Sequence, residues 1–170
     1  MENSSKNKIP RWNLDSIFPS LQSTEYKAAL ADFENQMNVL GELLQSADRF
    51  TREANSNFDF APWLAAYLKN QNELIANERT LVAYAYIIYS TDTTNTQYLN
   101  NLSHIDELTN RTKQLHLKFT SLLTAHSASL DDFYKRFPEF SEYKFLLEEE
   151  MQETKHQMSV AEEALASDLN

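Results

Sequence analysis

The 170-residue chain contains no cysteine, one glycine and four prolines. The absence of cysteine excludes disulfides, thiolate metal sites and a cysteine nucleophile. Because glycine and proline make most tight turns, their scarcity disfavours an antiparallel β protein with many hairpins. A single glycine also excludes the phosphate-binding loop and the G-x-S-x-G nucleophile motif. The composition therefore predicts an all-α protein without these catalytic motifs.

Long apolar runs and clustered basic residues are also missing. The longest apolar run, Leu81 to Tyr89, is far shorter than the roughly 18 residues that a membrane span needs. The N-terminal residues have no apolar segment of the kind that a secretory signal requires, so we expect a cytoplasmic location and no membrane partner. The net charge of -10 disfavours nucleic acid as a partner, because phosphate binding needs clustered cations.

The stretch from Asp59 to Ser90 is predicted to form one long helix around which the rest is organised. From Leu81 to Tyr89 every residue is apolar or aromatic, and a helix that is apolar all round must be covered all round. We therefore expect its second half at the centre of the domain. Its seam has alternating spacings of four and three residues and consists of Trp63, Tyr67, Asn70, Leu74, Asn77, Leu81, Tyr84 and Ile88.

Two amides, Asn70 and Asn77, interrupt this seam. A buried amide costs roughly 1–3 kcal/mol if it finds no hydrogen-bond partner. We expect these residues to set the helix register or to be exposed, and ligand binding is the less favoured alternative.

Helices are also predicted on both sides of this stretch. The first begins near Ser23, a plausible N-cap, and has the apolar face Tyr26, Leu30, Phe33, Met37, Leu40 and Leu44. After Asp59 to Ser90, we expect a long helix following Thr96, a short one over 130–137, a long one over 139–156 with core residues Tyr143, Leu146, Leu147 and Met151, and another opening at Ser159.

The predicted fold is a bundle of about four long helices with an extended N-terminal arm and a truncated C-terminal helix. Prolines at both ends of the arm disfavour a regular helix there, and Trp12 and Phe18 are expected to press it onto the body. The alternative is that the arm docks onto another domain. The predicted division is an arm over 1–22, a helical bundle over 23–156, and over 157–170 the start of a linker helix toward a missing catalytic domain.

The candidate chemical groups are better explained by structure. The four histidines, His104, His116, His126 and His156, form no i, i+4 pair, and no H-E-x-x-H occurs. Glu148, Glu149 and Glu150 diverge on a helix and are expected to be solvated, while Asp131 and Asp132 charge a helix start. The tyrosines Tyr84, Tyr86 and Tyr89 could line a pocket or bind a peptide, although core packing is favoured. No catalytic, metal or cofactor-binding residue is therefore predicted in this chain.

Three stretches resemble the N-terminal region of bacterial oligoendopeptidase F, a zinc metallopeptidase related to the thimet oligopeptidases. Arg11 to Ser20, RWNLDSIFPS, is similar to the family's W-[DN]-L-x-x-[IL]-[FY] arm. Tyr89 to Thr93, YSTDT, places an Asp after a Tyr-rich helix, as the family tends to do. Glu148 to Leu165 resembles its Leu-Ser-x-x-Glu-Glu segment, with Met158 standing where Leu is more usual.

The resemblance implies a helical N-terminal domain that forms a wall of a peptide-binding channel and limits substrates to short peptides. It implies zinc in the full-length protein, as well as two partners, the protein's own C-terminal catalytic domain and short peptides. This chain lacks H-E-x-x-H, so we expect it to be inactive by itself. The residues expected to line the channel or contact the other domain are Trp12, Phe18, Tyr86 and Tyr89.

A second hypothesis is a free-standing helical-bundle interaction or adaptor protein that presents an apolar groove to a partner. The abrupt end at Asn170, soon after a capped helix start, favours a domain fragment over this alternative. A fragment should also leave an exposed apolar patch near Trp12, Phe18 or the last helix.

Overall fold

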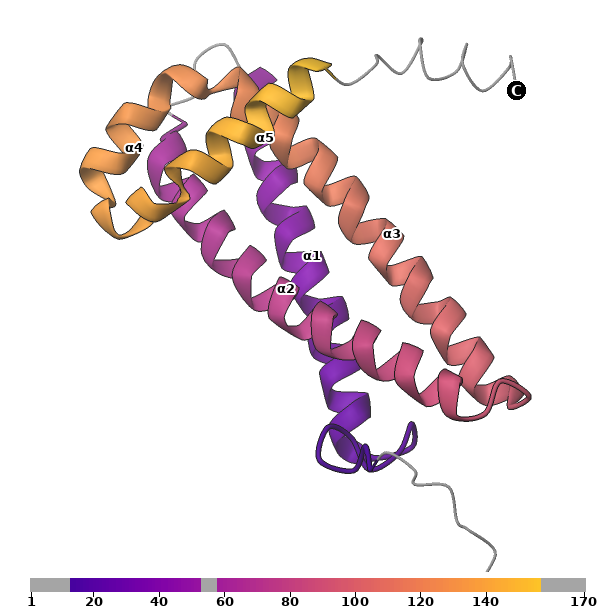
Figure 1. Ribbon diagram of the computed structural model, residues 1–170. Helices are drawn as coiled ribbons and strands as arrows, with labels where there is room; N and C mark the ends of the chain where they lie inside the picture. The colour runs from indigo at the N-terminus through magenta and orange to yellow at the C-terminus, as the bar shows by residue number, and fades with distance from the viewer. Residues whose placement is uncertain (1–12, 53–57, 157–170) are drawn as a thin grey trace, which may run out of the picture. The chain divides into compact units, whose positions relative to one another are not determined.

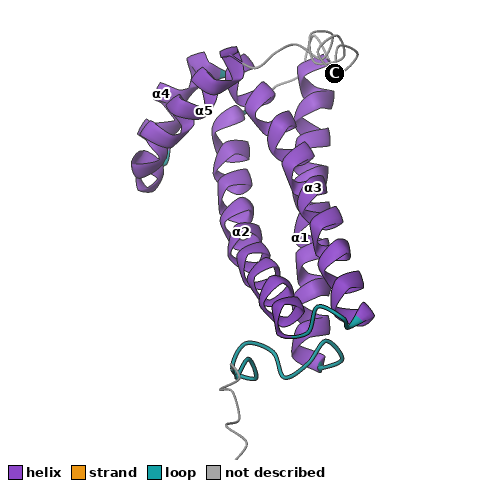
Figure 2. Cartoon of the chain, turned by 45° about the vertical axis from the view of Figure 1, so that its right-hand side comes forward, coloured by secondary structure: helices purple, strands orange, loops and turns teal. Residues whose placement is uncertain are grey.

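The computed structural model describes residues 13–52 and 58–156, and within them every regular element is a helix (Figure 1, Figure 2). The all-α prediction is therefore confirmed, with three long helices and two shorter ones over these residues. In chain order the elements are α1 (Thr24–Arg52), α2 (Phe60–Thr91), α3 (Thr96–Ala125), the 3₁₀ turn η1 (Ser127–Ser129), α4 (Leu130–Arg136), the 3₁₀ segment η2 (Pro138–Tyr143) and α5 (Lys144–His156).

The chain divides into two compact units that each draw on all three long helices. The first unit comprises Met1–Gln36 and Glu73–Asn110, and the second comprises Met37–Asn72 and Arg111–Asn170. The division into an arm, a bundle and a linker follows chain order and stays a prediction. Trp12 and the helix expected from Ser159 lie outside the described residues.

In the first unit, the segment before α1 is anchored by Phe18. The backbone N–H groups of Ile17 and Phe18 donate to the Leu14 carbonyl at 2.9 and 3.1 Å, which makes a single turn in this segment. The buried Phe18 ring lies 5.3 Å from the Tyr26 ring and 5.0 Å from the Tyr84 ring, both edge-on. Such edge-to-face pairs add to the free energy gained from burial. Phe18 therefore packs into the core, as predicted.

Local capping and amide contacts in the first unit also follow the sequence. The Ser23 hydroxyl accepts a hydrogen bond from the Tyr26 N–H at 3.2 Å, so Ser23 is the N-cap of α1. Asn77 donates from Nδ2 to the Ala29 carbonyl at 2.9 Å and so joins α2 to α1, as the register interpretation predicts. Within the second unit, Asn70 instead donates to the Ala66 carbonyl of its own helix.

The core of the second unit is an aromatic stack. The Tyr67 and Phe119 rings are stacked, with centroids 4.2 Å apart and an angle of 6° between their planes. The centroid of the Trp63 ring lies 5.5 Å from that of Tyr67. The Trp63 Nε1–H donates to the Leu43 carbonyl at 2.9 Å, which satisfies its polar group inside the core. The Phe58 ring lies 6.0 Å from the Trp63 ring, and this contact forms a hydrophobic staple at the start of α2.

Two burial predictions are wrong. The end of α2 is not covered all round, because Tyr86 is 64% exposed; the buried face consists of the seam residues Leu81, Tyr84 and Ile88 together with Ala85. Leu146, expected in the core, is 48% exposed, while Leu147 is buried. The reason is that consecutive residues of α5 point about 100° apart, so the face that buries Leu147 leaves Leu146 at its exposed edge.

Candidate functional site

The residues predicted to line a channel or contact another domain have different surroundings. Phe18 is buried in the aromatic cluster with Tyr26 and Tyr84, so it contributes to packing. Tyr86 is exposed and Tyr89 is half-buried. Among the described members of the set, Tyr86 is the side chain most available for contact with a partner. Their role at a channel or domain interface stays a prediction.

A groove of about 460 Å³ lies between α1 and α3 in the second unit. Its floor is formed by Met37, Gly41 and Leu115, and exposed polar side chains stand along both rims. We call it the α1–α3 groove; its rims are Asn38, Glu42 and Gln45 from α1 and Arg111, Gln114 and Lys118 from α3. The predictions from sequence named none of these residues as a site. The rim residues are spaced three and four positions apart, which is the ordinary pattern of any helix face. This spacing therefore does not indicate a groove.

Titratable groups meet in the second unit where α5 packs onto α3. His116 Nε2 lies 3.2 Å from Glu150 Oε2. Burial raises the pKa of Glu150, and the neighbouring His116 partly opposes this rise. Burial also raises the pKa of Tyr67, with a further contribution from Glu150. The prediction that Glu150 belongs to a solvated acidic face is therefore wrong for this one residue, whereas Glu148 and Glu149 are exposed.

The raised pKa of Glu150 predicts a pH-dependent stability. The pKa of Glu150 in the folded state lies above the ordinary value of 4.5, so the folded state holds this proton more tightly than the unfolded state does. The stability that protonated Glu150 contributes is therefore fully present below pH 4.5 and is lost as the pH rises through the folded-state pKa. Relative to Glu150→Gln, the native chain should therefore lose stability as the pH rises above the ordinary Glu pKa of 4.5. Urea unfolding followed by circular dichroism measures this difference.

Glu149→Gln is the control for that measurement, because Glu149 is exposed on the same helix. The difference in unfolding midpoint between Glu150→Gln and the native chain should change with pH. The corresponding difference for Glu149→Gln should change much less. Parallel pH profiles for both variants would show that burial of Glu150 has no energetic consequence.

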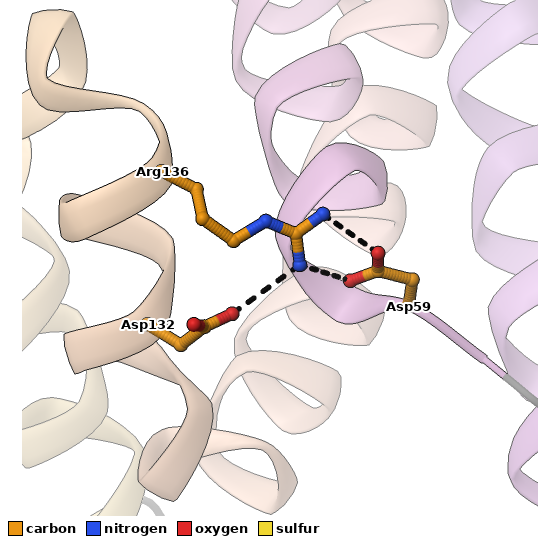
Figure 3. Close-up of polar contacts among 3 residues, drawn as sticks. All are labelled: Asp59, Asp132 and Arg136. Carbon is orange, nitrogen blue, oxygen red and sulfur yellow. Dashed lines mark hydrogen bonds and ion pairs between the residues drawn. The ribbon is translucent and has the colours of Figure 1, made fainter.

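An ion pair joins α4 to the start of α2 (Figure 3). The two terminal nitrogens of Arg136 each donate to one carboxylate oxygen of Asp59 at 2.7 Å, and Nη1 also reaches Asp132 at 3.3 Å. The Arg136 guanidinium lowers the pKa of the Asp59 carboxyl. Asp59 also accepts a hydrogen bond from the Ala61 backbone and so caps the start of α2. The prediction that Asp132 charges a helix start is confirmed, because Asp132 lies in the first turn of α4.

The three described histidines make ordinary structural contacts. His104 lies 3.9 Å from Glu34, His116 pairs with Glu150, and the His126 ring stacks on Phe60 at 4.9 Å. Over residues 13–52 and 58–156, no group of three or more His, Asp or Glu side chains could hold a metal ion. No helix found there is long and apolar enough to cross a membrane. The residues described do not fit a zinc site.

These features define a helical domain whose described part is held together by aromatic and polar contacts. Residues 122–170 match the family model for the N-terminal region of M3 peptidases, described as oligopeptidase F. This match confirms the resemblance over the segment that contains α4 and α5, while the stretches Arg11–Ser20 and Tyr89–Thr93 lie outside it. No match was found among curated proteins or among solved structures.

Proposed function

We propose that this chain is the N-terminal helical domain of an oligoendopeptidase F-like zinc metallopeptidase. In the full-length protein it forms a wall of the peptide-binding channel and limits substrates to short peptides. The observation that carries the proposal is the family match over residues 122–170. M3 peptidases are zinc-dependent in general, and the metal would be held by the catalytic domain, because this chain contains no H-E-x-x-H motif.

The packing of the matched segment supports extending the proposal beyond it. Residues 122–170 belong to the second unit, which also contains Met37–Asn72 and residues 111–121. Arg136, inside the match, binds Asp59 outside it, and Asn72 donates to the Tyr143 hydroxyl at 2.6 Å. Because the matched helices are tied to α2 by these contacts, they and the unmatched part of this unit form one structural body.

Exposed apolar side chains support a contact with the catalytic domain. Phe145 and Leu146, at the start of α5, are 70% and 48% exposed. Adjacent large apolar groups on a surface are typical of an interaction site. They lie in α5, whereas the apolar patch predicted from the sequence is placed near Trp12, Phe18 or the helix expected from Ser159. Tyr86 on α2 is a further exposed aromatic residue, and the proposal retains it, with Tyr89 and Trp12, as part of the channel or interdomain surface. Phe18, which is buried, belongs to this proposal only as a core residue that packs against Tyr84 of the same helix.

The proposal also covers partners and location. The partners are the chain's own catalytic domain and short peptides, with no nucleic acid, as the net charge of -10 indicates. The proposed location is the cytoplasm. The domain division of 1–22, 23–156 and 157–170 is part of the same proposal.

The test is to determine the coding sequence beyond Asn170 and to assay the protein that it encodes. An open frame with H-E-x-x-H is expected, and the full-length protein should cleave quenched short peptides in a chelator-sensitive manner while leaving folded proteins intact. Residues 1–170 alone should leave the same peptides uncut. A stop directly after Asn170 would instead favour the free-standing interaction protein. Chelator-sensitive cleavage by the 170-residue chain would contradict the assignment of catalysis to another domain.

A further inference from the structure

The floor of the α1–α3 groove contains the only glycine of the chain, Gly41. A Cβ atom added at Gly41 would meet Leu115 Cδ2 at 3.9 Å, an ordinary van der Waals distance. Its backbone φ is not positive, so neither packing nor backbone geometry requires glycine there. Glycine inside a helix is destabilising relative to alanine. Its effect at this position is to leave the groove open between Met37 and Leu115.

The α3 rim of the groove carries two cations, Arg111 and Lys118. They are seven residues apart, which places them on one face of α3 about 10 Å apart along the helix axis. In the part of the chain that the structure describes, neither forms an ion pair, although the protein has a net charge of -10. The opposite rim contributes one acid, Glu42. The α3 rim is therefore a locally positive edge on an acidic protein, suited to a ligand with two negative groups.

The rest of the lining indicates what joins those two negative groups. Asn38, Gln45 and Gln114 each offer an amide that both donates and accepts hydrogen bonds, as a peptide bond requires. The apolar floor beside Gly41 can take one aliphatic side chain. The volume of about 460 Å³ lies within the range of small-ligand sites. A spacing of about 10 Å corresponds to about three residues of extended chain.

We propose that the α1–α3 groove binds a short acidic peptide by its free C-terminus. Arg111 pairs with the terminal carboxylate, because a guanidinium binds a carboxylate through two parallel hydrogen bonds. Lys118 pairs with an acidic side chain three residues before that terminus, and an aliphatic side chain between them lies over Gly41. The inference rests on the groove residues alone and goes beyond the proposed function. Its failure would leave open the search for H-E-x-x-H beyond Asn170, which tests the proposed function separately.

The test is a titration of the ¹⁵N-labelled 170-residue chain with the peptide acetyl-Glu-Ala-Leu-Val. We expect shifts in the backbone amides of residues 37–45 and 111–118. Amidation of the peptide C-terminus, or Gln in place of its Glu, should each weaken binding by about tenfold or more. Higher salt should weaken it further, since the rim charges are exposed.

Variants of the chain separate charge and shape from general effects. The double variant Arg111→Gln, Lys118→Gln should lose binding by about a hundredfold, whereas the matched exposed pair Lys69→Gln, Arg79→Gln should bind like the native chain. Gly41→Ala should keep binding, and Gly41→Leu, which fills the floor, should lose it with an unchanged circular dichroism spectrum.

Any one of these results would overturn the proposal: no binding up to about 10 mM peptide, shifts confined to other residues, equal losses in the two double variants, or equal binding of the amidated peptide. Octanoate provides the last comparison, because it supplies a carboxylate and an aliphatic chain without peptide bonds. Equally tight binding of octanoate would refute recognition of a peptide.

Discussion

Replacement of Phe133 by alanine is expected to lower the free energy of unfolding by about 3–5 kcal/mol. Phe133 on α4 is fully buried, and its ring lies 5.7 Å from Phe137 and 5.6 Å from Phe140. Truncation leaves a cavity among rings that can only partly collapse, and the loss of transfer free energy adds to this cost. Denaturant unfolding followed by circular dichroism measures the difference.

Phe145→Ala provides the matched control, because it removes the same atoms from a ring that is 70% exposed. Exposed substitutions of this kind usually change stability by about 0.5 kcal/mol or less. Both residues lie in the segment that matches the oligopeptidase F family. Similar destabilisation by the two variants would mean that α4 is not packed as described. Under the proposed function, Phe145→Ala is the variant expected to weaken contact with a catalytic domain.

Phe18→Ala is the second substitution with a large expected effect, about 3–5 kcal/mol. Phe18 is 7% exposed and has edge-on contacts with Tyr26 and Tyr84. Burial raises the pKa of both tyrosines. Removing the ring admits water to their hydroxyl groups, so the pKa of each should fall toward the ordinary value of 10.0. Ultraviolet absorbance titration of tyrosinate measures this fall.

Ile17→Ala is the neighbouring control, since Ile17 is 39% exposed and is not part of the aromatic cluster. It should leave the tyrosine titration unchanged. If Phe18→Ala were as mild as Ile17→Ala, Phe18 would be a surface residue available for another domain, which is the alternative that the sequence leaves open. The titration therefore separates a core role of Phe18 from an interdomain role.

The long helices are predictable because their signals are local. The helix expected over Asp59 to Ser90 is found as Phe60–Thr91, since its staple and seam lie within the stretch itself. The N-cap at Ser23 similarly fixes the start of α1. Each of these signals depends on residues a few positions apart, where helical geometry alone decides which side chains meet.

Contacts between distant residues are not predictable in this way. Asp59 and Arg136 are 77 positions apart, and no periodic pattern links them. The i, i+4 spacing of Asp132 and Arg136 was the one signal available, and it points to a pair within α4 alone. Leu146 and Leu147 are adjacent apolar residues of α5, and their spacing does not decide which of the two faces the core. The α1–α3 groove likewise requires two helices to be brought together.

The shortness of α4 has a consequence for how this region folds. A seven-residue helix is far below the roughly 12–15 residues that an isolated helix needs to persist in water. The Leu130–Arg136 turns therefore form only when Phe133 is buried and Arg136 has reached Asp59. Backbone amides of α4 should exchange with solvent deuterium together, through one opening that releases both contacts. Hydrogen exchange of this helix thus reports when the family-matched segment detaches from α2.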